Sequence, residues 1–176
     1  MKFNEDILKE LGLEPNEKQE PVNVMRVSEM LDFMKQCAER IESKSRKYTT
    51  SRDVEIQTDC IDIVTARLND FTQVFKDLMI FIRREEGTYK GGTSLRYCMA
   101  SFETFNFNET EEEKLFLREL LLRNEITHDY FNRELHQQKL IWLMENCSSG
   151  VVDVYKDIYT YCLKQELLEK FTNRNI

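Results

Sequence analysis

The sequence predicts an all-α protein, an up-down bundle of four to five helices, and three observations lead to this prediction. The 176 residues include only 5 Gly and 2 Pro, so few positions interrupt a helix. Hydrophobic residues make up 41% and charged residues 32%, a mixture that suits amphipathic helices. Apolar residues recur every three or four positions, and no segment shows the strict alternation of a strand. The length fits one domain.

The N-terminal segment, residues 1–23, is predicted to be an arm or extension that precedes the helical bundle at 24–176. Both prolines of the chain, Pro15 and Pro21, lie in this segment. Its composition is polar after one short apolar stretch, whereas a regular helical pattern starts at Val24.

Two long helices are predicted first. One begins near Val24, and its end is blurred in the polar, basic run 43–47. The next begins after Thr50 or Ser51 and ends before Gly87, because glycine is the residue that most often follows the last turn of a helix.

Shorter helices complete the bundle. Thr110 followed by Glu113 is a capping-box pattern, in which a threonine and a glutamate satisfy the first free backbone N–H groups of a helix. The other predicted helices cover 95–102, a segment that starts at Asn132, and a last segment from Val151 to about Phe171.

The net charge of −7 argues against a protein that coats nucleic acid with a broad basic face. It leaves open an enzyme that holds a short stretch of RNA in a local basic pocket. It also suits a basic protein partner.

The cysteine pattern indicates free thiols in a reducing compartment. The five cysteines are odd in number, scattered, without a C-x-x-C pair, and each falls in an apolar helical pattern. The first ten residues carry three carboxylates, unlike a signal peptide, and no apolar run approaches the roughly 20 residues that span a bilayer. We therefore expect a cytoplasmic protein with no membrane association.

The most concentrated chemical signal is the segment 123–130, RNEITHDY. Arg123 is permanently charged and can fork onto phosphate oxygens, where it would stabilise developing charge. His128 titrates near neutral pH and can transfer a proton. If the ribose 2′-OH is the nucleophile, cleavage of RNA needs no metal, and the sequence offers neither clustered Cys/His ligands nor a cofactor motif.

The spacing sets a geometric condition. Residues five apart in a straight helix lie about 140° apart around its axis, so Arg123 and His128 would not converge on one phosphate. A helix that ends or kinks near Thr127 would turn His128 back toward Arg123, and two-fold dimerisation would bring two copies of the motif across one cleft.

The pattern Arg-x4-His-x-Tyr, with Asn directly after the arginine, resembles the HEPN superfamily. Within it, the likeness is to HepT-like toxins encoded beside a minimal nucleotidyltransferase antitoxin. The resemblance is tight over 120–132 and loose over about 24–170, where only helix order and length match. The first 20 or so residues have no counterpart, and the chain is longer than a typical member.

The resemblance implies a homodimer that cleaves RNA without a metal ion or cofactor and is neutralised by a nucleotidyltransferase-type antitoxin. It implies that Arg123 binds phosphate, that His128 transfers protons, and that Asn124 shapes the cleft. Tyr130 would accept AMP from the antitoxin.

Structural readings of the same residues remain open. Arg123 could pair with Glu119 or Glu125 on a solvated helix face. His128 could be a helix-end residue bonded to a carbonyl, and Tyr130 could belong to the core.

Outside the motif, His136 is expected to be structural, and Trp142 to lie in the core or a dimer interface. Two other functions compete with the nuclease. One is a non-catalytic substrate-binding or regulatory partner of a nucleotidyltransferase. The other is a helical interaction protein in which the motif is accidental.

Overall fold

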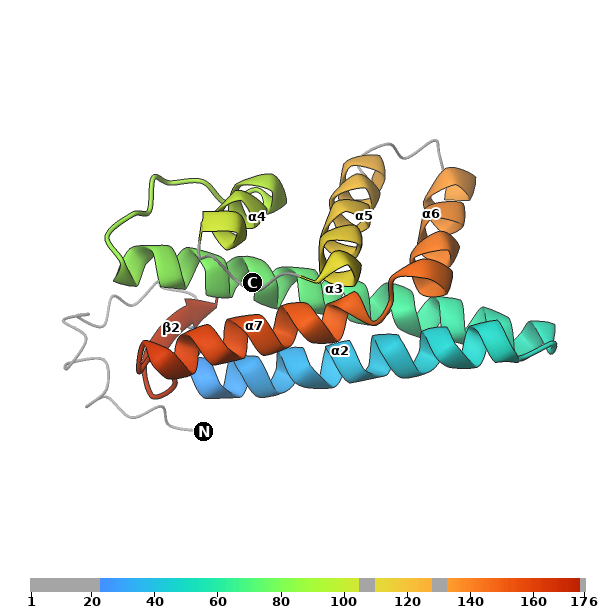
Figure 1. Cartoon of the computed structure of the whole chain (residues 1–176), viewed down its shortest axis with the longest axis horizontal. Helices are drawn as coiled ribbons and strands as arrows, with labels where there is room; N and C mark the ends of the chain where they lie inside the picture. The colour runs from blue at the N-terminus through green and yellow to red at the C-terminus, as the bar shows by residue number, and fades with distance from the viewer. Residues whose placement is uncertain (1–22, 105–109, 128–132, 175–176) are drawn as a thin grey trace, which may run out of the picture.

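The computed structural model describes residues 23–104, 110–127 and 133–174, and within them it confirms the predicted all-α bundle (Figure 1). The predicted arm at 1–22 lies outside the described residues. The described part contains six helices and two short strands: β1 Asn23–Arg26, α2 Val27–Thr50, α3 Val54–Glu85, α4 Leu95–Thr104, α5 Glu111–Thr127, α6 Arg133–Asn146, α7 Gly150–Lys164 and β2 Phe171–Arg174.

The helices form two sets with different directions (Figure 1). The long helices α2 and α3 run side by side as a hairpin, and α7 lies along α2. The shorter helices α5 and α6 stand across this layer, while α4 packs on α3. Side chains of α5 reach α3 at two points, where the ring of Phe116 contacts that of Phe71 and where Arg123 hydrogen-bonds to Asn69.

Aromatic side chains of α3 join the two sets. The rings of Phe71 and Phe116 meet edge to face, with centroids 5.9 Å apart and an angle of 87° between their planes. The rings of Phe75 and Phe102 lie 6.0 Å apart. All four side chains are buried, and contacts of this kind stabilise by about 0.5–1.5 kcal/mol beyond the area they bury. They fix α5 and α4 on the face of α3.

The first two helices follow the predicted pattern. α2 continues through the basic run 43–47 to Thr50, because lysine and arginine are good helix formers and Ser45 lies on the buried face. Asp53 caps α3 with its carboxylate, which accepts hydrogen bonds from the backbone N–H groups of Glu55 at 2.9 Å and Ile56 at 3.3 Å. Gly87 follows α3 with a φ of 68°, as predicted for a glycine after a helix end.

The last helix ends at Lys164, so the prediction that it reaches Phe171 was wrong. Glu166 adopts a φ of 56°, in the left-handed region. Its N–H donates to the carbonyl of Leu163, and the N–H of Leu167 donates to that of Cys162. This pair of bonds is a Schellman motif, formed without the glycine that usually marks one.

The two strands were also missed, since the sequence was predicted to contain none. β1 pairs with β2 in antiparallel register from Asn23↔Arg174 to Arg26↔Phe171. Strands of four residues are too short to show a hydrophobic alternation. Asn23, assigned to the arm from the sequence, therefore belongs to the folded domain.

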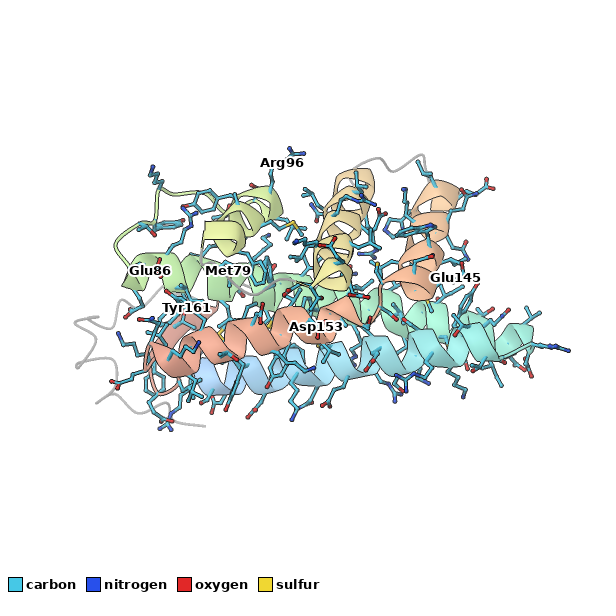
Figure 2. All side chains as sticks on the ribbon, in the orientation of Figure 1. Met79, Glu86, Arg96, Glu145, Asp153 and Tyr161 are labelled. Carbon is cyan, nitrogen blue, oxygen red and sulfur yellow. The ribbon has the colours of Figure 1, made fainter. Side chains whose placement is uncertain are left out.

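Side chains tie the end of α3 to the C-terminal segment. The hydroxyl of Tyr161 on α7 hydrogen-bonds to the carboxylate of Glu86, and the two lie next to one another in Figure 2. Lys170 forms an ion pair with Glu85. These contacts hold the turn that leads from α7 into β2 against α3.

The five cysteines are all buried and free, as predicted from their place in apolar patterns. Burial raises the pKa of Cys98 to about 11 and that of Cys162 to about 12. None of the described helices is both long and apolar enough to cross a membrane.

Gly150, the first residue of α7, allows the closest approach between α7 and α5. A Cβ atom at this position would lie 2.3 Å from the carbonyl oxygen of Glu112 and 2.8 Å from the Cβ of Phe116. Backbone atoms of α5 cannot yield as a flexible side chain would.

We therefore expect Gly150→Ala to lower the free energy of unfolding by about 1–3 kcal/mol, the usual cost of overpacking. Urea denaturation measures the change. Ser149→Ala is the matched control, because Ser149 is exposed and its side chain makes no capping bond. Equal stability of the two variants would contradict the close packing of α7 on α5.

Candidate functional site

A capping box at Thr110 fixes where α5 begins. The hydroxyl of Thr110 accepts a hydrogen bond from the N–H of Glu113 at 3.1 Å, and the Glu113 carboxylate accepts one from the N–H of Thr110 at 3.3 Å. This is the arrangement that the sequence predicted. Because the start of the helix is fixed, the residues that face the core are fixed as well.

Arg123 occupies a core-facing position of α5. The buried residues of the helix include Glu113, Phe116, Leu120 and Arg123, at spacings of three, four and three, which is one face of a helix. Arg123 is only 4% exposed. The alternative that it pairs with a carboxylate on a solvated helix face is therefore wrong.

The buried guanidinium has an uncharged partner. Nη1 of Arg123 donates to Oδ1 of Asn69 on α3 at 3.2 Å, and its Nε has no partner among the described residues. Glu119, one turn earlier, pairs with Arg118 at 3.3 Å and with Lys139 at 3.6 Å instead. Burial lowers the pKa of Arg123, because an apolar environment disfavours the charged form. Removal of an ion from water costs several kcal/mol unless a counter-charge or polar groups replace the solvent.

The guanidinium lines a pocket of about 190 Å³ between α3 and α5. The α3 wall is polar, and its residues share one helix face because they lie three, four and seven positions apart. The α5 wall combines one apolar side chain with the first two residues of the motif. The lining residues are Asn69, Thr72, Gln73, Lys76, Leu120, Arg123 and Asn124.

The pocket is positively charged although the protein is acidic. Among the described side chains, Lys76 and Arg123 are the charged ones that line it and no carboxylate does, while the whole chain has a net charge of −7. The buried carboxylate of Asp77 lies behind the wall, where it accepts a hydrogen bond from Nε2 of Gln73 at 3.0 Å. This bond orients the Gln73 amide. Two cations beside uncharged amides and a hydroxyl favour a small anion.

His136 on α6 lies within electrostatic reach of Arg123. Burial lowers the pKa of His136 below its ordinary value, and the positive charge of Arg123 lowers it further. Its Nε2 is buried and has no partner among the described residues. His136 is half-buried, and its closeness to the motif arginine was not predicted from the sequence.

Of the other predicted site residues of the motif, the structure describes Asn124 only. Asn124 lines the pocket beside Arg123. His128 and Tyr130 lie outside the described residues. On α6, Trp142 is 37% exposed, so it is not a fully buried core residue.

The α3 wall was missed by the sequence analysis. Asn69, Gln73 and Lys76 form a polar stripe next to the apolar stripe of a long helix, which is the only sequence signal they carry. Such stripes usually face solvent. Only the structure shows that this polar stripe of α3 faces side chains of α5.

Among the described residues, no group of three or more His, Cys, Asp or Glu side chains is placed to hold a metal ion. Comparisons with protein-family models, curated proteins and solved structures found no match to this chain.

Because Arg123 lies close to His136, its positive charge should hold down the pKa of the His136 imidazole. Arg123→Met removes the charge but keeps an aliphatic side chain, so we expect the pKa of His136 to rise toward its ordinary value of about 6.5. NMR titration of the imidazole resonances measures this. Arg46→Met, on the exposed face of α2, is the control that should leave the pKa unchanged. An unchanged pKa in Arg123→Met would show that the two side chains do not interact.

Proposed function

We propose that this protein is a metal-independent endoribonuclease of the HEPN toxin type, in which Arg123 binds the scissile phosphate and His128 transfers protons. The observation that carries the proposal is the state of Arg123. Its guanidinium is almost fully buried, has a neutral partner in Asn69, and lines a pocket without carboxylates. A phosphate oxygen would supply the counter-charge that this guanidinium does not find among the described residues.

The mechanism follows from the chemistry of the two residues. The ribose 2′-oxygen attacks the adjacent phosphorus while its proton passes to a histidine. The bond from phosphorus to the 5′-oxygen breaks, and that oxygen takes up a proton. The products are a 2′,3′-cyclic phosphate and a 5′-hydroxyl. Arg123 stabilises the charge that grows on the phosphate oxygens, and His128 transfers the protons.

The proposal includes an assembly and a means of control. A homodimer would bring two copies of the motif to one cleft, so that Arg123 of one copy and His128 of either copy meet the same phosphate. Asn124, which lines the pocket, would shape this cleft. A nucleotidyltransferase-type antitoxin would silence the enzyme by adding AMP to Tyr130.

A second candidate function is a nucleotide-binding partner of a nucleotidyltransferase that does not cleave RNA. One observation favours it: the cations and amides of the pocket come from α3 and α5, so the pocket can bind a phosphate without His128. The two functions differ in their dependence on His128.

The test of the proposed function is RNA cleavage by the purified protein in the presence of EDTA. We expect wild type to produce 2′,3′-cyclic phosphate ends. His128→Ala should reduce the rate by about 10²–10⁴-fold, the usual contribution of a general acid or base. Arg123→Met should reduce it by about 10²–10³-fold, as loss of one stabilising donor does.

Controls separate loss of function from loss of structure. Arg118→Met removes an exposed arginine from the same helix and should cleave at the wild-type rate. Circular dichroism should show that each variant keeps its helices. Cleavage that disappears with EDTA, or that survives in both motif variants, contradicts the proposal. Nucleotide binding that persists in His128→Ala, with no cleavage by wild type, supports the second candidate.

A further inference from the structure

We propose that the pocket between α3 and α5 is a phosphate subsite, in which Lys76 joins Arg123 in binding one phosphate group of a polynucleotide without reading its base. This inference deepens the proposed function and takes its substrate class from it. It assigns a binding role to α3, a helix outside the motif.

The guanidinium of Arg123 has an N–H donor without an acceptor among the described residues. A guanidinium has five N–H donors, and one of them donates to Asn69. The Nε group is buried in the protein without a partner among the described residues. A buried donor without an acceptor costs about 1–3 kcal/mol, in addition to the cost of burying the charge, and the negative charge of a bound phosphate offsets the second of these costs.

Lys76 places a second positive charge at the pocket. Lys76 lies on the same face of α3 as Asn69 and Gln73, two turns after Asn69. It lines the same pocket as Arg123. Lysine at such a site acts as a point charge, while the arginine supplies directed bonds. Their two positive charges exceed the single negative charge of a phosphodiester, so the pocket attracts this group although the protein as a whole is acidic.

The size of the pocket and the residues that line it suit a phosphate group. The pocket has a volume of about 190 Å³, below the roughly 300 Å³ at which sites for drug-sized ligands begin. No aromatic side chain of the described residues lines it, so this part of the chain offers no stacking surface of the kind that single-stranded nucleic acid sites use for bases. The bond to Asp77 fixes the orientation of the Gln73 amide. These features suit a phosphate group and exclude a stacked base.

The first experiment uses wild-type protein and inorganic phosphate, so it is independent of any cleavage. We expect the side-chain amide NMR signals of Asn69 and Gln73 to shift during a phosphate titration at constant ionic strength, and to stay in place when chloride replaces phosphate. Lys76→Gln should weaken this response. Signals that do not move with phosphate would overturn the proposal.

The second experiment measures RNA binding with His128→Ala protein and oligonucleotides of uridine or adenosine. Adding Lys76→Gln should weaken binding about tenfold or more and lower the salt dependence by about one counterion. The loss should be equal for both oligonucleotides. Lys35→Gln, an exposed residue of α2 that pairs with Glu39, is the matched control and should bind as its parent does.

The outcomes separate this inference from the proposed function. Phosphate-dependent shifts without RNA cleavage by wild type support the subsite and contradict the nuclease. Cleavage by wild type, together with RNA binding that Lys76→Gln does not alter, supports the nuclease and contradicts the subsite. A loss in Lys76→Gln that differs between uridine and adenosine would contradict recognition of phosphate alone.

Discussion

The burial of the Arg123 charge against α3 is the constraint on which the account of this protein depends. A charged side chain occupies a position of α5 that its helical spacing assigns to the core, and its partner there is the neutral amide of Asn69. An apolar residue would fill the same space at a lower cost in desolvation. A guanidinium at this position suits a role that needs a positive charge, and the proposed binding of phosphate is such a role.

The rest of the fold holds this charge in place. The capping box at Thr110 fixes the start of α5, and the ring contact between Phe71 and Phe116 fixes its rotation relative to α3. The close contact at Gly150 brings α7 against the first turn of α5. None of these residues lines the pocket, yet a shift in any of these contacts would move Arg123 relative to the α3 wall. Substitutions near residue 110 or 150 can therefore affect the site without touching it.

The sequence predicted the positions of helices and several of their ends. It did not predict which side chains meet where one helix packs on another. The apolar spacing, Gly87 and the Thr110 capping box predicted the main helices and several of their ends, because these signals are local. The Schellman motif at Glu166 and the two short strands were missed, since neither has its usual residue pattern. The same distinction applies to the site. Arg123 and Asn124 were identified from the motif, whereas Lys76 on α3 became a candidate only because α5 crosses α3 there.

The most direct test of the central claim follows the Nε–H resonance of Arg123 by nitrogen NMR in wild-type protein. The ligand is a dinucleotide whose 2′-deoxy sugar prevents cleavage, and chloride at equal ionic strength is the reference. We expect this resonance to shift in proportion to the bound ligand, because a phosphate bound beside the guanidinium changes the electrostatic field at the buried Nε–H. A resonance that stays in place while the dinucleotide binds elsewhere on the protein would contradict it.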